Sequence, residues 1–357
     1  MDGDARAAEA PSSGTVSATT AAAPTLQDKR LALADCIRAD LFAADLRWSL
    51  FVAAAQSFKY DTVLRPFPPQ FGSADVKEID RLREVMTQMP AFPTLLSLLE
   101  NPSTDCSDRG QLIDLLYWVL IVQDDPGVRT LSKEEVDQVL AQAPGGKLPR
   151  PHFIFAIGPK KFTEKQKRFS ELSKNFKTFF GYHGSRIDNF YSIICHGLIS
   201  TLSKREVYGK GTYLSTDFST SLNFSPSGCG WGASIIGSGL SCMALCEILE
   251  HPDVIYEKSD TETQKTAEDS QFGPVPQKYI LVRNSDLVQI RYLLVDGKNP
   301  HSLTCHKEAN ASMIGWFCKH KMFTLMLGYV LLLSAVGMSN SPTVMRYCRM
   351  FLRRWNH

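Results

Sequence analysis

The amino-acid sequence predicts an α+β protein with an all-helical N-terminal domain, a mixed or antiparallel β domain and one C-terminal transmembrane helix. Three observations support this prediction. Apolar residues recur at helical spacing through residues 27–143. Short apolar runs bounded by turn residues, with few helical stretches between them, then occupy residues 150–300. Residues 322–345 contain no charged side chain, which makes a run long enough to cross a membrane.

The helical domain is predicted from stripes of apolar residues spaced by three and four. The first stripe, on one helix face, consists of Ile37, Leu41, Ala44, Trp48 and Phe51. Another helix, which Asp75 can cap, carries Ile79, Leu82 and Met86, and a further stripe contains Leu112, Leu115, Leu116 and Val119. Ser132 and Glu135 form a capping box, and the Pro-Gly-Gly run at 144–146 ends the helical region. We find no catalytic cluster in this domain and expect its stripes to be core.

The β domain is predicted from apolar runs and the turns between them. A helix is expected at 189–197 and a helical turn at 219–224, and the polar stretch 256–273 is expected to be a long exposed loop. The expected strands are residues 153–157, 179–183, 212–214, 241–248, 279–282 and 288–295.

Composition excludes several classes of protein. The net charge of +2 does not by itself point to nucleic acid or to an acidic partner. The nine cysteines include no Cys-x-x-Cys pair, so the zinc-finger spacing is absent and free thiols in a reducing compartment are expected. Residues 1–26 lack the basic and apolar regions of a secretory signal, and we expect a disordered tail there.

A group of basic residues lies between residues 160 and 177, diluted by Glu164 and Glu171. A solvated helix or hairpin face explains such a group most simply. Binding of an acidic protein or of nucleic acid is the alternative. We expect no specific nucleic-acid binding.

Three short runs stand in order in the β domain, with the sequences GYHGS at 181–185, YGKGTYL at 208–214 and KYILV at 278–282. His183 can both accept and donate hydrogen bonds, and Gly184 beside it leaves room for a flat ligand. Tyr213 follows two glycines that permit a tight turn. Taken singly, His183, Tyr213 and Tyr279 are more typical of structural or core residues. The ordered set indicates a ligand site.

This set resembles the NAD-binding signature of the poly(ADP-ribose) polymerase family, over residues 179–295. The resemblance implies an ADP-ribosyltransferase fold, NAD⁺ as co-substrate and no metal. Members of the family carry a serine eight positions, and an aromatic residue eleven positions, after the tyrosine that corresponds to Tyr213. Ser221 and Phe224 match these two positions. The catalytic residues implied are His183, Tyr213 and Tyr279. The implied NAD-binding residues are His183, Gly184, Ser185, Tyr208, Gly211, Tyr213, Ser221, Phe224 and Tyr279.

One departure from the family pattern concerns the reaction. Polymerases carry a glutamate where this chain has Tyr279, and that glutamate activates the ribose acceptor for chain growth. A tyrosine phenol is a poor general base at neutral pH, but it can orient a ribose by hydrogen bonding. The sequence therefore predicts transfer of single ADP-ribose units to protein substrates, including the enzyme itself. The acceptor must supply its own carboxylate, amine or thiol, and the transition state should resemble an oxocarbenium ion.

The uncharged run 322–345 spans about 36 Å as a helix, against a hydrocarbon core of about 30 Å. A buried core helix is the alternative, but the run has no amphipathic face. We expect a juxtamembrane linker at 301–321, a transmembrane helix at 322–345 and a short lumenal tail at 346–357. Flanking basic residues slightly oppose a cytosolic N-terminal side. The missing signal peptide favours a cytosolic catalytic domain.

The whole chain thus resembles family members that transfer single ADP-ribose units while anchored in the endoplasmic reticulum membrane. This membrane is continuous with the nuclear envelope, so the expected location includes both. A second hypothesis is a catalytically inactive, NAD-binding scaffold on the membrane. A third is a helical adaptor carrying a vestigial enzyme. Retention of His183 favours the enzyme.

Overall fold

The computed structural model describes residues 23–73, 76–101, 107–123, 125–146, 149–161, 163–199, 208–256 and 275–298. All of them belong to one unit of the structure. Across these described residues, no helix is both long and apolar enough to span a bilayer. The predicted linker at 301–321, transmembrane helix at 322–345 and tail at 346–357 lie outside the described residues.

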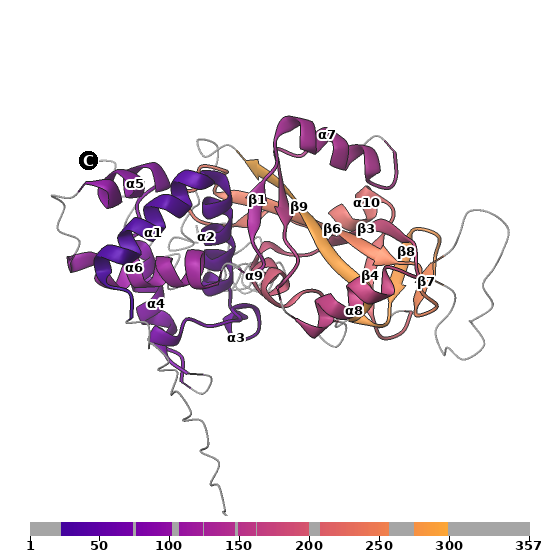
Figure 1. Cartoon of the computed structure of the whole chain (residues 1–357), viewed down its shortest axis with the longest axis horizontal. Helices are drawn as coiled ribbons and strands as arrows, with labels where there is room; N and C mark the ends of the chain where they lie inside the picture. Colours follow the sequence, from indigo (N-terminus) through magenta and orange to yellow (C-terminus); the bar gives the residue numbers. More distant parts are fainter. Residues whose placement is uncertain are drawn as a thin grey trace, which may run out of the picture. The chain divides into compact units, whose positions relative to one another are not determined.

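The N-terminal part of the described chain is a helical bundle (Figure 1). Asp40 ends α1 and caps α2 by accepting from the Ala43 amide, so the first predicted stripe is divided between two helices. α4 begins at Ile79 with Glu78 in the N-cap position, so the expected cap at Asp75 is wrong. The helical segments are α1 (Leu26–Ala39), α2 (Leu41–Gln56), α3 (Tyr60–Val63), η1 (Pro69–Phe71), α4 (Ile79–Thr87), α5 (Phe92–Glu100), η2 (Ser107–Arg109), α6 (Gly110–Tyr117) and the π-helical η3 (Trp118–Val122).

The bundle is followed by a sheet that, in the described residues, has nine strands in the order β1-β2-β9-β6-β3-β4-β8-β7, with β5 paired to β6. All the strand pairs are antiparallel. The strands are β1 (Val128–Thr130), β2 (Phe153–Ile157), β3 (Thr178–Gly184), β4 (Thr212–Ser215), β5 (Gly228–Cys229), β6 (Gly239–Leu249), β7 (Val254–Tyr256), β8 (Tyr279–Val282) and β9 (Val288–Lys298). The accompanying helices are α7 (Lys133–Gln142), α8 (Glu164–Leu172), α9 (Ile187–His196), α10 (Phe218–Leu222) and η5 (Ser285–Leu287).

Helices cover both faces of this sheet. Alternate residues of a strand point to opposite faces, so one strand can contribute to the core on each side. On β6, Cys242 and Ala244 belong to the large core that includes the bundle, whereas Met243 and Leu245 join Val136 of α7 in a second core. α9 lies between α2 and the sheet (Figure 1). The predicted α+β architecture is confirmed, and of the two predicted sheet types, mixed or antiparallel, the described sheet is antiparallel.

One part of the predicted organisation is wrong. The sequence predicts an all-helical domain, with loops but no strand, over residues 27–143, but β1 falls in this stretch and pairs with β2. Three residues are too few to show an alternating pattern, and propensity alone does not identify so short a strand. α7 begins with the expected Ser132 and Glu135 capping box, yet it packs on the sheet and not in the bundle. Strand pairing thus begins before the predicted boundary at residue 143.

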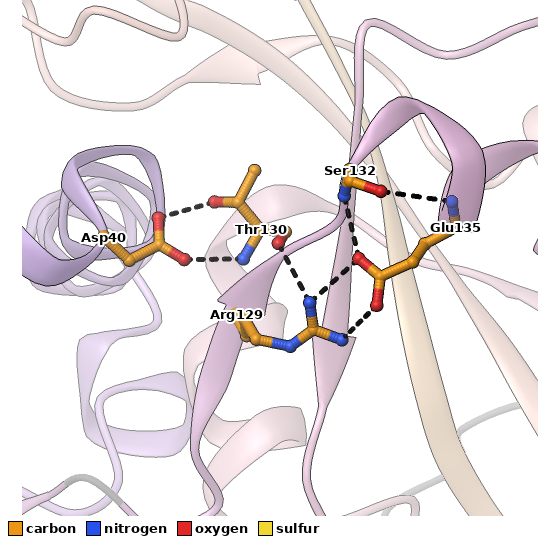
Figure 2. A network of polar contacts seen from close by, with 5 residues as sticks. All are labelled: Asp40, Arg129, Thr130, Ser132 and Glu135. Carbon is orange, nitrogen blue, oxygen red and sulfur yellow. Dashed lines mark hydrogen bonds and ion pairs between the residues drawn. The ribbon is translucent and has the colours of Figure 1, made fainter.

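The junction between bundle and sheet is a polar network around β1 (Figure 2). The Asp40 carboxylate accepts from the Thr130 amide and hydroxyl, both at 2.7 Å. Arg129, the preceding residue, donates to both carboxylate oxygens of Glu135, at 2.8 and 2.9 Å. Glu135 also accepts from the Ser132 amide at 2.9 Å. One short strand therefore connects the start of α2 to the start of α7.

Candidate active site

A cavity of about 760 Å³ lies where β3, β4 and β8 meet α3, α9 and α10. Its volume is in the range typical of sites for small molecules and cofactors. Of the nine residues that the sequence predicts for the site, eight line this cavity. The ninth, Gly211, does not line it, but the next residue, Thr212, does. The three sequence runs are therefore brought together in space, as β3 pairs with β4 and β4 pairs with β8.

His183 is held by the backbone of the next strand. Its Nδ1 lies 2.9 Å from the carbonyl oxygen of Tyr213. Because a carbonyl oxygen can only accept, Nδ1 carries the proton in this contact, and Nε2 of the neutral ring remains an acceptor. Burial lowers the pKa of His183 below its usual value, partly offset by the bond to Tyr213. The site therefore presents a neutral imidazole that can accept a ligand hydroxyl.

Gly184 permits the close contact between β3 and α10. A Cβ atom at this position would lie 2.0 Å from the carbonyl oxygen of Ser221. The Ser221 hydroxyl is buried and donates to the carbonyl of Tyr182 at 3.1 Å. Its oxygen keeps a lone pair, which can accept from a ligand amide. Phe224 lies one turn later, with its amide bonded to the Ser221 carbonyl, and lines the same cavity.

Three tyrosines lie together in the lining of the cavity. The Tyr208 ring lies 6.4 Å from the Tyr213 ring and 6.1 Å from the Tyr279 ring, between centroids. The Tyr213 hydroxyl donates to the Gly209 carbonyl at 2.7 Å and accepts from the Tyr208 amide at 2.9 Å. Gly209 has a φ of 105°, which favours glycine. The Tyr213 ring is thus fixed by its own turn, and its hydroxyl is already used.

Gly211, in the same turn, lies close to the backbone of β8. A Cβ atom there would lie 2.7 Å from the carbonyl oxygen of Val282 on β8. Tyr279, at the other end of β8, stands opposite Ser215 of β4. Ser215 in turn donates to the Lys278 carbonyl at 2.6 Å. The β8 backbone therefore holds Tyr279 at the cavity, although its hydroxyl has no hydrogen-bond partner among the described residues.

The first turns of α9 supply further polar residues. The Asn189 amide donates to the Ser185 hydroxyl at 2.8 Å, and both residues line the cavity. Arg186 also lines the cavity and pairs with Asp188 at 3.1 Å. Sequence reasoning identified Ser185 but not Asn189, which stands one helical turn later on the same face.

The helical bundle also contributes to the cavity, although the sequence analysis found no functional cluster there. Lys59, Thr62, Val63 and Arg65, around α3, line the same cavity as His183 and Tyr279. No motif marks this segment, and only tertiary packing brings it to the site. Among the residues that the structure describes, no group of three or more His, Cys, Asp or Glu side chains is placed to hold a metal ion.

Adjoining strands of an antiparallel sheet present a neutral histidine and a tyrosine wall bounded by glycines to one cavity, and α10 adds a buried serine. This arrangement defines a catalytic domain of the ADP-ribosyltransferase type. Comparison with known proteins agrees. Residues 136–296 match the family model of the poly(ADP-ribose) polymerase catalytic domain, and residues 35–120 match that of the ARTD15 N-terminal domain. This chain belongs to the poly(ADP-ribose) polymerase family.

Individual relatives support this assignment along most of the chain. The protein mono-ADP-ribosyltransferase PARP16 of Mus musculus is 37% identical over 320 residues, which cover 87% of this chain and 95% of the relative. The Homo sapiens protein of the same name is 35% identical over 317 residues, covering 86% and 94%. The protein mono-ADP-ribosyltransferase PARP8 of Mus musculus is 28% identical over 267 residues, covering 62% of this chain and 30% of that protein.

Proposed function

We propose that this chain is an NAD-dependent protein mono-ADP-ribosyltransferase. The observation that carries the proposal is that His183 and Tyr279 line one cavity, with a phenol in the position where polymerases of the family carry a carboxylate. The cavity fits the cofactor. It has space for a dinucleotide, a neutral imidazole to accept a ribose hydroxyl, and aromatic rings on which the flat nicotinamide can stack.

The chain's residues have separate roles in the reaction. His183 accepts a ribose hydroxyl, Ser221 accepts from the nicotinamide carboxamide, and the Tyr213 ring provides a stacking surface. NAD⁺ supplies a glycosidic carbon–nitrogen bond whose electron pair leaves with nicotinamide and neutralises its positive charge. The acceptor's nucleophile then bonds to the ribose carbon, and an amine or thiol acceptor releases its proton to water. Positioning of the donor is the enzyme's contribution.

The described residues that line the cavity include no aspartate or glutamate. A ribose hydroxyl of a bound ADP-ribose would need a base to become a nucleophile, and a phenol does that poorly. Carboxylates, amines and thiols on proteins need less activation. The absence of a carboxylate base in this part of the chain therefore favours one transfer over chain growth.

The test uses purified full-length protein and NAD⁺ labelled in its adenylate phosphate. We expect the protein to label itself, with one ADP-ribose unit released per site when the product is resolved on a sequencing gel. Ladders of many units would overturn mono-transfer. A folded wild-type protein that binds NAD⁺ without transferring label would instead support the scaffold hypothesis.

We further propose that residues 322–345 anchor the enzyme in the endoplasmic reticulum membrane, with the catalytic domain in the cytosol. The support is the length and uncharged character of this run. Full-length protein should stay in the membrane pellet during carbonate extraction, and removal of residues 316–357 should release an active enzyme. Recovery of the full-length chain in the soluble fraction would refute the anchor.

A further inference from the structure

The segment from Lys59 to Arg65 belongs to the bundle but forms one wall of the catalytic cavity. It is anchored to α9 by two hydrogen bonds. The buried Ser57 hydroxyl donates to Asp188 at 2.9 Å, and the Tyr191 hydroxyl donates to the Pro66 carbonyl at 3.1 Å. Both α9 residues are nearly fully buried. Because α9 begins two residues after Ser185, these bonds fix the segment relative to His183.

The charges along the cavity have one sign. The described residues that line it include three cationic side chains, Lys59, Arg65 and Arg186, and no carboxylate. Arg186 is already paired with Asp188. Lys59 lies over the Phe58 ring, 5.0 Å from its centroid, and pairs with no carboxylate among the described residues. The Arg65 Nε donates to the Asp61 carbonyl at 3.0 Å. Its terminal amino groups pair with no carboxylate in the described part of the chain.

A wall of this kind fits an anionic ligand group, because uncompensated like charges around a cavity attract the opposite charge. If NAD⁺ binds here as the proposed function requires, its one anionic group is the diphosphate. We propose that Lys59 and Arg65 of the helical bundle bind the NAD⁺ diphosphate. The bundle then completes the co-substrate site.

The test measures binding without turnover on the full-length protein. The probe is carba-NAD, whose stable carbocyclic bond prevents transfer, and binding is followed by calorimetry. We expect Lys59→Gln and Arg65→Gln each to raise the Kd by about tenfold, and the double variant by more. Raising the salt concentration should weaken wild-type binding more than binding by the double variant.

Two controls make the result specific. Nicotinamide has no phosphate, so its affinity should be unchanged in both variants. Arg81→Gln removes an exposed cation of the bundle that pairs with Glu78 outside the cavity, and it should bind carba-NAD like the wild type. Arg65→Lys keeps the charge and should recover part of the affinity, even if Arg65→Gln disturbs the local fold.

The outcomes separate this inference from the proposed function. Wild-type protein that binds carba-NAD, with variants that bind it equally well, would overturn the diphosphate contact and leave the transferase proposal in place. Variants with normal carba-NAD affinity but reduced labelling of a protein substrate would do the same, and would assign the segment to the acceptor. A wild-type protein that binds neither carba-NAD nor nicotinamide would overturn both.

Discussion

The two walls of the cavity differ in how the sequence specifies them. The strand wall consists of β3, β4 and β8, and its side chains are oriented by backbone contacts such as that between His183 and the Tyr213 carbonyl. The helical wall consists of the segment around α3 and of α9, joined by side-chain contacts such as that between Ser57 and Asp188. The strand wall depends on local geometry, whereas the helical wall depends on packing between distant parts of the chain. Substitutions in the strand wall should therefore disturb local geometry, whereas substitutions in the helical wall should disturb packing between distant parts of the chain.

The largest effect is expected at Gly184, where the strand wall has no spare space. Gly184→Ala would place a methyl group 2.0 Å from the Ser221 carbonyl, so β3 and α10 must separate. We expect transfer to be lost and unfolding stability to fall by about 1–3 kcal/mol, as for other overpacked sites. The measurements are NAD⁺-dependent self-labelling and the thermal midpoint.

Gly232→Ala is the matched control for this substitution. A Cβ atom at Gly232 would meet nothing within 4 Å. This variant should keep both activity and thermal midpoint. Full activity in Gly184→Ala would show that the strand wall is less constrained than the contact with Ser221 implies.

A second prediction concerns the helical side and pH. Asp45 of α2 is fully buried and accepts from the Ser234 hydroxyl and the Ile235 amide of the loop before β6. Burial raises the pKa of Asp45 to about 6, only partly offset by these bonds. The folded protein therefore holds this proton more tightly than the unfolded chain does. Stability should fall as pH rises from about 4 to 6, by up to about 3 kcal/mol, and stay level above that.

Asp45→Asn removes this titration, so the difference in unfolding free energy between wild type and variant isolates it. Urea unfolding at a series of pH values between 4 and 8 measures both curves. His183, whose pKa is lowered, contributes the opposite slope in both proteins and cancels in the difference. A difference that does not change with pH would contradict the assignment to Asp45.

His183→Ala tests the strand wall without overpacking it. The substitution leaves a ligand hydroxyl without its acceptor, which costs about 1–3 kcal/mol of binding free energy. We expect weaker binding of NAD⁺ and slower transfer, with a thermal midpoint close to that of the wild type. Calorimetric titration and single-turnover labelling give the two quantities. Unchanged transfer by the folded variant would remove His183 from the site.

The difference between the walls also explains what could be predicted from the sequence. The strand wall could be predicted because close backbone approach requires glycine at fixed positions, as at Gly184 and Gly211, and such constraints leave a recognisable pattern. Lys59 and Arg65 could not be predicted, since a lysine and an arginine beside a short helix are ordinary surface residues until packing places them. β1 was missed for a related reason. It is a strand through pairing with β2, and its three residues carry no pattern of their own.

The smallest effect is expected at Tyr279, which we propose stands where polymerases of the family carry a glutamate. Tyr279→Phe keeps the ring contact with Tyr208 and removes only the hydroxyl, which has no hydrogen-bond partner among the described residues. Transfer should slow less than in His183→Ala, by about 1 kcal/mol, the value of one ordinary hydrogen bond.

Tyr279→Glu introduces the residue type of the polymerases but should still not extend chains, because a polymerase also needs a site for the ADP-ribose acceptor. Product length on a sequencing gel measures this directly. Long chains from Tyr279→Glu would show that one carboxylate is sufficient, and a larger defect in Tyr279→Phe than in His183→Ala would give the phenol the leading role.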